Sequence, residues 1–546
     1  MTRSLARCAL TRREPLTLAA GAAVLTALVV ALAPPGTDFA AHAYQTALFA
    51  RRGFDFWNNG WYAGRYEFVT YSILYYPLAS VFGMALVAVV GQAMAVGAFA
   101  FLLHDEFGPQ GRWAARTFAL VWPLFMVTAA FPSALGLTFA LLALRSLQRG
   151  RTTRACALCT MTLATSPLAF LLLTVLLAAI AFGKRIRGRE LLYPALTVLV
   201  LAAVELLLWK VFPSRARSLP RPEKMLSLVA FCAVVVALAW RVERARVLSC
   251  IFIGYGVATV LAYLVPSAIG DAVTRLDLVA VPMVVLALSL GAGRGRPRAL
   301  VAAAVGLSAW LNVAPLVSSF AAGVRTEASG ASYWQPAVAF LRVHQSPSYR
   351  VEAVDTLGHW PALYLARAGI PLARGWFRQD DFPQNAILYR RLTPQIYIAW
   401  LRTMAVRYVV LPDAGLDFSA RREADVLRSG RSGLRVVLRT RHLTIFDVPR
   451  PRAIVTGAGR ARVLSLTQSS ALLDVRHAGT YRVAIRYTPY WDISAGCVRR
   501  ARDGMTRVTV PHTGEVRLVF HWTPERALDV LSGAPASDCP RFGARS

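Results

Sequence analysis

Asp38 and His42 are the residues whose types and spacing best suit chemistry. They lie four positions apart in the polar, aromatic stretch 34–77, which falls between two runs apolar enough to cross a membrane. If Thr37 caps a helix, both side chains share one face close to its N-terminus. A carboxylate held there can accept a proton from a sugar hydroxyl, and His42 can share that role or help to bind a metal or a phosphate. An N-terminal helix charge at Asp38 with a packing residue at His42 explains the same pattern.

Glu67 and Tyr71 stand at the end of the same stretch with the same spacing. Glu67 can face one pocket with Tyr71 as a second carboxylate, ligate a metal, or accept a hydrogen bond from a sugar hydroxyl. A solvated loop acid is the alternative interpretation. The eight aromatic residues from Phe54 to Tyr71 predict a headgroup belt, where rings bury their bodies and keep polar tips wet.

Two further segments carry candidate binding residues. Arg275 stands beside Asp277 at the predicted outer mouth of a span, where an arginine can clamp a lipid phosphate by paired hydrogen bonds. An Arg–Asp structural pair or an interfacial anchor fits equally well. The segment 376–385, WFRQDDFPQN, combines Trp376 with Asp380 and Asp381, which suits stacking and hydrogen bonding to a sugar. An Asx-rich turn would have the same composition.

The composition indicates that these residues belong to a polytopic membrane protein, whose helices must position them. The 546 residues are 56% hydrophobic and 16% charged, too apolar for a soluble enzyme of this length. The net charge is +32, and almost all of the basic residues are arginine. In a membrane protein this excess serves topology, anionic headgroups or pyrophosphates, so we expect no nucleic-acid partner.

Hydropathy predicts eleven membrane spans, each needing about 20 apolar residues for a full crossing. The first is a retained helix, since no clear cleavage site follows it. The short fifth span is expected to be half of a broken or re-entrant pair that meets the sixth at Ser166-Pro167. The spans are 16–33, 72–103, 114–131, 133–148, 155–166, 168–183, 191–210, 225–240, 247–266, 277–292 and 299–320. With the N-terminus in the cytoplasm, inside loops hold 20 Arg and Lys and outside loops hold 9. This bias predicts that loop 34–71 and the C-terminal part lie outside the plasma membrane.

The domain prediction follows from where the spans stop. Residues 1–320 form the transmembrane domain, 321–449 a mixed α/β region and 450–546 a β-sandwich-like region. Thr393–Thr403 is expected to be a helix, while Val406–Pro412 and Leu434–Leu438 are expected to be buried strands. If this part lies outside the cytoplasm, Cys497 and Cys539 can form a disulfide. The sequence has no Walker loop, no serine-nucleophile elbow, no HExxH and no Rossmann fingerprint.

The Asp38-to-His42 element and the FWNNGWYAGRYEFVTYSILYYP run (residues 56–77) after a first helix resemble the GT-C superfamily of membrane glycosyltransferases. Within it, the segments ARGWFRQDDFPQN, VRYVVLPDA and GTYRVAIRYTPYWDI resemble bacterial membrane proteins labelled 6-pyruvoyl-tetrahydropterin synthase-related, themselves similar to YfhO-like proteins. The label implies no pterin chemistry, because the eight histidines include no HxH pair.

The resemblance implies a GT-C-like helical membrane domain and an inverting transferase. Asp38 maps onto the catalytic acid of the first loop, and the mapping of Glu67 and Arg275 is weaker. The donor would be a sugar on polyprenyl phosphate, and the acceptor an envelope glycan, lipid or protein. It is left open whether a divalent cation, Mg²⁺ or Mn²⁺, is bound; Asp38, His42 and Glu67 are the residues that would hold it. The alternatives are a lipid or glycan flippase and a non-catalytic GT-C scaffold that binds glycans.

Overall fold

The computed structural model describes residues 2–186, 189–213, 221–265, 270–291, 295–324, 327–457 and 459–533. The chain divides into two compact units. The helical unit comprises residues 1–39, 71–206 and 217–324, and the β-rich unit comprises residues 40–70, 207–216 and 325–546.

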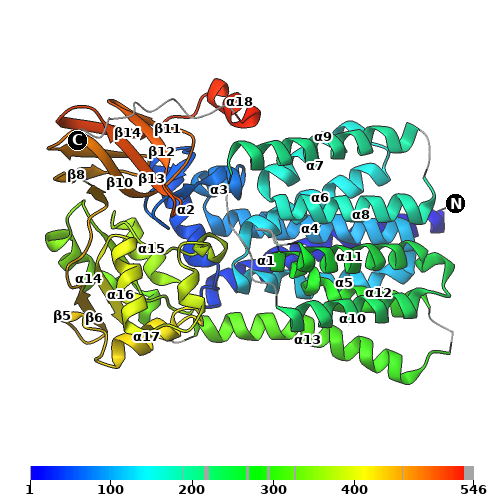
Figure 1. Cartoon of the computed structure of the whole chain (residues 1–546). Helices are drawn as coiled ribbons and strands as arrows, with labels where there is room; N and C mark the ends of the chain where they lie inside the picture. The colour runs from blue at the N-terminus through cyan, green and yellow to red at the C-terminus, as the bar shows by residue number, and fades with distance from the viewer. Residues whose placement is uncertain are drawn as a thin grey trace. The chain divides into compact units, whose positions relative to one another are not determined.

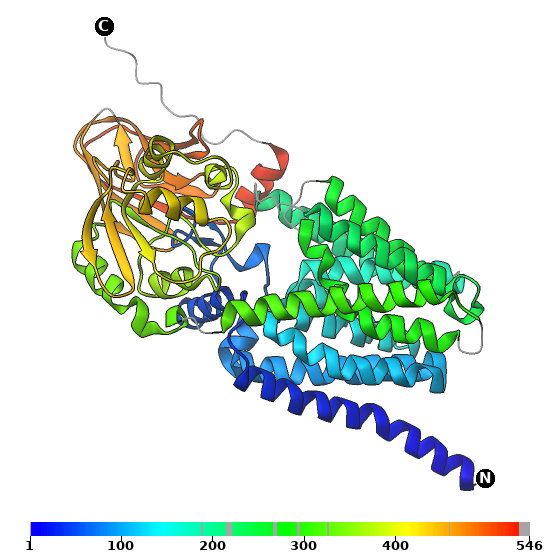
Figure 2. The same ribbon diagram turned by 90° about the horizontal axis from the view of Figure 1, so that it is seen from below.

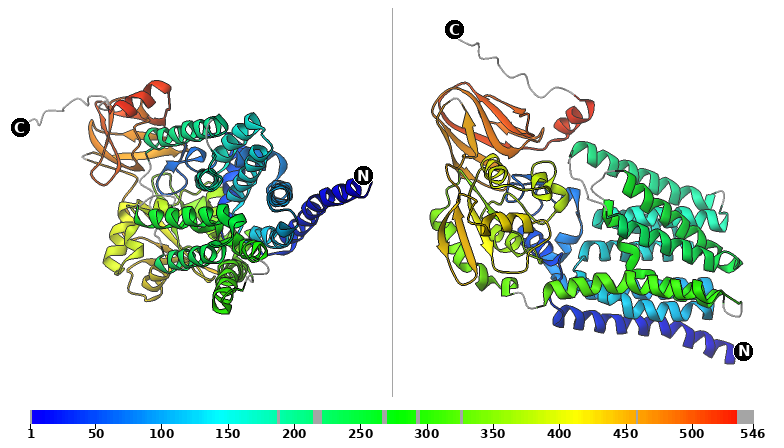
Figure 3. Two further views of the ribbon diagram at one scale, coloured as in Figure 1. Left: turned by 90° about the vertical axis from the view of Figure 1, so that its right-hand side faces the viewer. Right: turned by 60° about the horizontal axis from the view of Figure 1, so that its bottom comes forward.

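Helices occupy every one of the eleven predicted spans, which confirms a polytopic membrane protein (Figure 1). Among the described residues, seven helical segments are long and apolar enough to cross a membrane. Figures 2 and 3 show the helices of this unit running alongside one another as a bundle. They are α1 (Thr2–Leu32), α3 (Tyr75–Phe82), α4 (Met84–Phe107), α5 (Arg112–Leu124), α6 (Phe131–Gln148), α7 (Thr152–Thr165), α8 (Pro167–Lys184), α9 (Arg189–Val211), α10 (Pro222–Ala239), α11 (Arg246–Leu264), α12 (Ala280–Leu290) and α13 (Arg298–Gly323).

The predicted break between the fifth and sixth spans is present. Ser166 is extended between α7 and α8, and its side chain accepts a hydrogen bond from the Ala169 backbone N–H. Pro167 begins α8, a position where its missing N–H costs nothing. The short fifth segment is therefore a helix that ends at a serine cap, with a second helix starting at once.

A four-stranded mixed sheet opens the C-terminal part of the β-rich unit. Its order is β3-β4-β6-β5, with β3 and β4 parallel. The predicted VRYVVLP strand is β4 and is almost wholly buried, but β5 is an exposed edge strand, so the predicted burial of Leu434–Leu438 is wrong. Its elements are α14 (Ala331–His344), β3 (Arg350–Ala353), α15 (Trp360–Arg367), α16 (Pro394–Thr403), β4 (Val406–Pro412), α17 (Arg421–Arg428), β5 (Arg435–Arg439) and β6 (Leu443–Asp447).

A β-sandwich follows, as the alternating pattern predicts. Its sheets have the orders β12-β13-β10-β7 and β11-β14-β9-β8, and their inward residues share one apolar core that includes Tyr481, Val508 and Leu518. The elements are β7 (Val455–Gly457), β8 (Ala461–Leu466), β9 (Ser470–Val475), β10 (Gly479–Arg486), β11 (Trp491–Ile493), β12 (Cys497–Arg500), β13 (Met505–Val510), β14 (Gly514–Phe520) and α18 (Pro524–Ser532). Cys497 is disulfide-bonded, and its predicted partner Cys539 lies outside the described residues.

The first loop is part of this β-rich unit. It forms α2 (Phe39–Arg52), the two-residue strands β1 (Trp57–Asn58) and β2 (Arg65–Tyr66), and a 3-10 turn, Phe68–Thr70. Trp57 and Trp61 are at most 2% exposed, and Trp57 stacks on Phe520 of β14 with ring centroids 5.6 Å apart. The predicted headgroup belt is therefore wrong for most of these rings, which are core residues of the β-rich unit.

Candidate functional site

Asp38 lies at the start of α2, and the helical unit holds it from two sides. The Asp38 backbone N–H donates to Thr128 O at 3.4 Å, in the turn between α5 and α6. Gly36 lies so close to this turn that a Cβ there would be 2.2 Å from Val127 O. A β-carbon cannot fit at that distance, so glycine is required for this approach.

Arg275 meets Asp38 across 237 residues of sequence. Its Nη2 donates to Asp38 Oδ2 at 3.1 Å, and its Nη1 donates to Ser133 Oγ at 3.2 Å. The 3-10 segment Gly270–Val279 carries Arg275, and Ser133 is in the first turn of α6. The side chains of Arg275 and Asp38 are 25% and 13% exposed, so solvent or a ligand can reach the pair. A pair with this exposure adds at most about 1 kcal/mol to stability, which leaves room for a functional role.

A large apolar cavity reaches the same segment. Its volume is about 1020 Å³, and Leu276 and Val279 contribute to its lining. Glu106 and Lys184 also line it and form an ion pair of 2.6 Å. Most of the remaining lining is leucine, valine, alanine and phenylalanine from α4, α6, α8 and α11. The residue after Arg275 therefore faces a space suited to a hydrocarbon chain.

His42 and Trp376 lie together in the β-rich unit. His42 is fully buried on α2, and its ring centroid is 6.3 Å from that of Trp376. His359 approaches the same indole at 6.0 Å, edge to face. The sequence predicted His42 and Trp376 as separate catalytic and binding residues, and the structure brings them together around a half-buried tryptophan. Asp38 belongs to the other unit.

Glu67 and Asp380 share one buried arginine. Arg65 Nη1 is 2.7 Å from Glu67 Oε1, and Arg65 Nε is 2.8 Å from Asp380 Oδ2. Asn58 donates to the second Glu67 oxygen at 2.5 Å, and the guanidinium lies 4.1 Å above the Phe377 ring. Burial raises the pKa of Glu67 although Arg65 opposes the shift. Both acids were predicted to bind substrate, but they are internal partners of Arg65.

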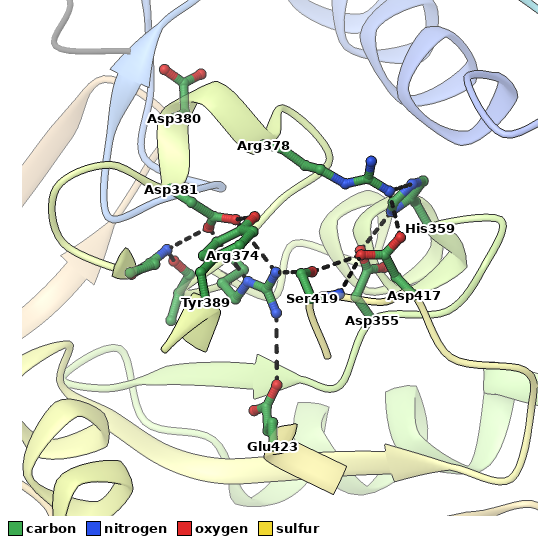
Figure 4. A network of polar contacts seen from close by, with 12 residues as sticks. Asp355, His359, Arg374, Arg378, Asp380, Asp381, Tyr389, Asp417, Ser419 and Glu423 are labelled. Carbon is green, nitrogen blue, oxygen red and sulfur yellow. Dashed lines mark hydrogen bonds and ion pairs between the residues drawn. The ribbon is translucent and has the colours of Figure 1, made fainter. Parts of the chain in front are cut away.

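Asp381 belongs to a second network, centred on Arg374 (Figure 4). Its two carboxylate oxygens are each 3.4 Å from a nitrogen of Arg374, and Tyr389 donates to one of them at 2.6 Å. Arg374 also lies 3.6 Å from Glu423. Asp381 is 1% exposed, so its predicted contact with a sugar is not supported by its position.

Four residues missed from the sequence complete the cluster beside Trp376. His359 Nδ1 is 2.5 Å from Asp355 Oδ2, and its Nε2 faces Arg378 Nη2 at 3.5 Å. Arg378 also donates to Asp417, and Figure 4 shows this His–Arg–Asp chain. Burial would raise the pKa of Asp417, but Arg378 and His359 hold it below its ordinary value. His359 has a φ of +56°, which is uncommon outside glycine and marks a strained position.

The signal for this cluster was present in the chain. Asp355 follows β3 and Asp417 follows β4, and these strands are parallel. Ligands commonly bind at the carboxyl ends of parallel strands, so polar residues after both strands were the sign to follow. Arg378 is 40% exposed, and its guanidinium lies 4.7 Å above Phe418, which is 44% exposed. Trp376, Arg378 and Phe418 together offer ring faces and hydrogen-bond donors of the kind that bind sugars.

The remaining predicted residues do not join these groups. Tyr71 is half-buried and lies just before α3 in the helical unit, whereas Glu67 lies in the β-rich unit. The Asp277 side chain is outside what the structure describes. In the described part of the chain, no three His, Cys, Asp or Glu side chains converge on a position that could hold a metal.

Comparisons with known proteins give structural likenesses only. No protein-family model and no curated protein matches the chain. The chain is similar to ArnT from Cupriavidus metallidurans in the apo state, at 13% identity and a TM-score of 0.41, covering 79% of this chain and 97% of ArnT. The chain is also similar to ArnT from the same organism bound to undecaprenyl phosphate, at 14% identity and a TM-score of 0.40, covering 80% of this chain and 98% of ArnT.

A third solved structure is the archaeal oligosaccharyltransferase AglB from Archaeoglobus fulgidus, in complex with an inhibitory peptide and a dolichol phosphate. The identity is 12% and the TM-score 0.35, covering 73% of this chain and 69% of AglB. At these values the likenesses carry no inference about activity.

Proposed function

We propose that the chain is a membrane glycosyltransferase of the GT-C type that transfers a sugar from a polyprenyl-phosphate donor to an envelope acceptor outside the plasma membrane. The contact between Asp38 and Arg275 carries the proposal. An acid suited to act as base and an arginine suited to bind phosphate, 237 residues apart, meet at 3.1 Å. Their partial exposure gives a substrate access to both.

Arg275 would hold the donor phosphate. A guanidinium can offer two parallel N–H donors to phosphate oxygens, and here Ser133 and Asp38 already orient it. The polyprenyl chain would lie in the 1020 Å³ apolar cavity, which the next residue, Leu276, helps to line. The phosphate and the chain of one donor would then be bound by consecutive residues of the same segment.

Asp38 would act as the general base in a single displacement. The acceptor hydroxyl gives its proton to the Asp38 carboxylate while its oxygen forms a bond to the anomeric carbon of the sugar. The bond from that carbon to the phosphate oxygen breaks, and polyprenyl phosphate leaves with the electron pair. Arg275 stabilises the negative charge that develops on this oxygen. One displacement inverts the anomeric configuration.

In the β-rich unit, Trp376, Arg378 and Phe418 would bind a sugar through their ring faces and hydrogen-bond donors. Asp380 and Asp381 support the loop that carries them, because both acids are held by buried arginines. His42 would act by packing against Trp376. A divalent cation does not fit Asp38 as it stands, since the bound guanidinium of Arg275 repels a cation.

The test compares rescue of a deletion strain by wild type, Asp38→Asn and Arg275→Gln. Cell-envelope glycans and lipid-linked sugars are measured together. Asp38→Asn preserves the size of the side chain and removes the base. We therefore expect the rate at which the missing glycan forms to fall about 10²-fold to 10⁴-fold. Glu14→Gln is the matched control, because it removes an acid from another partly exposed ion pair of the helical unit, with Arg112 and Arg116.

The outcomes separate the alternatives. Full rescue by both site variants would contradict the catalytic roles and favour a glycan-binding scaffold. If a lipid-linked sugar accumulates in the deletion strain and its amount returns to the normal level with Asp38→Asn as well as with wild type, that result would favour a flippase. Loss with Asp38→Asn and Arg275→Gln, but not with Glu14→Gln, supports the transferase.

A further inference from the structure

Helix α18 turns two leucines away from the β-sandwich that it follows (Figure 1). Ala527 is buried and Val530 packs against the apolar core, so this side of the helix faces the sandwich. Leu528 and Leu531, three positions apart, share a different side and are 65% and 37% exposed. Asp529 is exposed on a third side. The helix therefore has an apolar side that the described part of the chain leaves largely uncovered.

The end of a membrane span belongs to the same compact unit as α18. Helix α9 supplies the apolar segment Leu192–Val211, which is long enough to cross a membrane, and its residues from Leu207 onward are part of the β-rich unit. Val211 and Phe212 are buried in the apolar core that the sandwich strands form. Trp209 remains exposed, as expected for a side chain near the end of a span that meets lipid. One surface of the membrane is thus located beside the sandwich.

A short chain of contacts joins α18 to this end of the span. The Tyr490 hydroxyl donates to Val211 O at 2.6 Å, and Arg526 of α18 donates from its Nη1 to Tyr490 O at 3.4 Å. Trp522, which comes just before the helix, stacks on Phe212 with ring centroids 6.5 Å apart. Only one residue therefore separates α18 from the last carbonyl of the span, and the helix lies where the span leaves the membrane.

A second exposed apolar residue, Phe54 of the first loop, reaches the same place by a separate route. Its ring is 41% exposed and meets Phe56 edge to face, with centroids 5.2 Å apart. Phe56 in turn stacks on Phe212 at 5.3 Å and on Trp522 at 5.2 Å. Phe54 and α18 are therefore attached to one aromatic group, which packs on the end of the span.

A lipid surface suits these residues better than another protein does. Apolar side chains held beside a membrane gain free energy by entering the boundary between headgroups and acyl chains, as amphipathic helices do. Protein interfaces bury about 800 Å² on each partner, which is more than two leucines and one phenylalanine expose. The exposed acids Glu525 and Asp529 of α18 disfavour anionic headgroups, so an uncharged phospholipid surface is the better match.

We propose that Phe54, Leu528 and Leu531 form a membrane-contact surface that inserts into the lipid beside the end of α9. The β-rich unit would then be held at the bilayer by this surface as well as by the span itself. Leu528 is the most exposed of the three residues and would make the deepest contact. The surface is independent of the Asp38–Arg275 site, and no glycosyl transfer is needed to detect it.

The experiment uses the full chain in phosphatidylcholine nanodiscs that contain a tracer of alkyne-bearing phosphatidylcholine. The photoreactive amino acid p-benzoylphenylalanine replaces Phe54, Leu528 or Leu531, one residue in each variant. After irradiation, the alkyne is coupled to a fluorophore and the lipid adduct is measured per amount of chain. One control replaces Val436, an apolar residue of edge strand β5 that is 42% exposed. The other replaces Asp529, which is exposed on another side of α18.

We expect the adduct yield at each of the three positions to be at least about 5-fold higher than at Val436, because a side chain within lipid meets many acyl C–H bonds and one in water meets few. The yield at Asp529 should be lower than at either leucine, since its side of the helix points elsewhere. The melting temperature of each variant is the folding check. If one variant fails to fold, the other two positions still test the proposal.

Three results would overturn the proposal. One is an adduct yield at Leu528 and Leu531 no higher than at Val436, which would mean that these leucines remain in water. Another is an equal yield at both leucines and at Asp529, which would mean that α18 presents no particular side to the lipid. The third is a cross-link between two copies of the chain in place of the lipid adduct, which would assign the surface to self-association.

Discussion

Replacing Arg65 by methionine should strongly destabilise the β-rich unit. The guanidinium is 6% exposed and neutralises Glu67 and Asp380 at 2.7 and 2.8 Å. Methionine fills much of the space above Phe377 but leaves two buried acids without their partner. Removing one member of a buried ion pair typically costs about 3–5 kcal/mol.

Glu67 limits this cost by taking up a proton. Holding a carboxyl protonated costs about 1.4 kcal/mol for each pH unit above its ordinary pKa, which is 4.5 for Glu67. The penalty for Glu67 is therefore about 3 kcal/mol at pH 7 and below about 1 kcal/mol at pH 5. For a unit of this size each kcal/mol lowers Tm by roughly 2–4 °C, so we expect a loss on the order of 10 °C at pH 7 and a much smaller loss at pH 5.

The assay is thermal unfolding of the detergent-purified chain, followed by tryptophan fluorescence, which reports on the buried Trp57 and Trp61. A triple variant, Arg65→Met with Glu67→Gln and Asp380→Asn, removes the charges together and should recover at least half of the loss. Arg462→Met, in an exposed pair with Asp474, is the control and should cost less than about 1 kcal/mol. An Arg65→Met protein that melts within 2 °C of wild type at pH 7, or one whose deficit is the same at pH 5, would refute the reasoning.

Two other changes test buried charges. Burial raises the pKa of Glu423 to about 7, against 4.5 when unfolded, although Arg374 opposes the shift. Because the pKa is higher in the folded state, the protonated Glu423 stabilises the fold below pH 4.5, and this contribution of about 3 kcal/mol is lost as pH rises to 7. Glu423→Gln should therefore flatten the fall of Tm between pH 5 and 8. An unchanged slope of Tm against pH would contradict this prediction. Burial, with the nearby charge of Arg482, lowers the pKa of Arg350 to about 9, and its Nε and Nη2 have no hydrogen-bond partner. Arg350→Met should therefore raise Tm at pH 7, and a fall of several degrees in the same unfolding assay would mean that the charge has an unrecognised counterpart.

The sequence predicted the class of fold because its signals are local. Long apolar runs predict membrane helices, and alternation in 480–487 and 515–522 predicts the strands β10 and β14, where inward residues such as Val483 form the sandwich core. The helix expected at Thr393–Thr403 is α16, and Thr393 caps it by accepting a hydrogen bond from the Ile396 N–H. These features depend on residues that are neighbours along the chain.

The fate of loop 34–71 could not be predicted in the same way. An aromatic, polar segment between two spans has the composition of an interfacial loop, but Trp57 packs on Phe520, more than 460 residues later. Its aromatics suit either a headgroup belt or a protein core, and only the distant partner decides between them. The exposed position of β5 was missed for a similar reason, since a short apolar run does not reveal whether a strand lies at an edge.

Burial separates the predicted acids into two kinds. Glu67 and Asp381 are each 1% exposed and are held by Arg65 and Arg374, so a substrate would have to break a buried ion pair to reach either acid. The Asp38 side chain is 13% exposed and its arginine 25%, so a phosphate can compete for Arg275 without unfolding any core. A phosphate that draws Arg275 toward itself would also loosen its contact with the Asp38 carboxylate, whose oxygen could then accept a hydrogen bond from an acceptor hydroxyl. Donor binding would thus prepare the base for the acceptor, a reason for these two residues to be in contact before either substrate arrives.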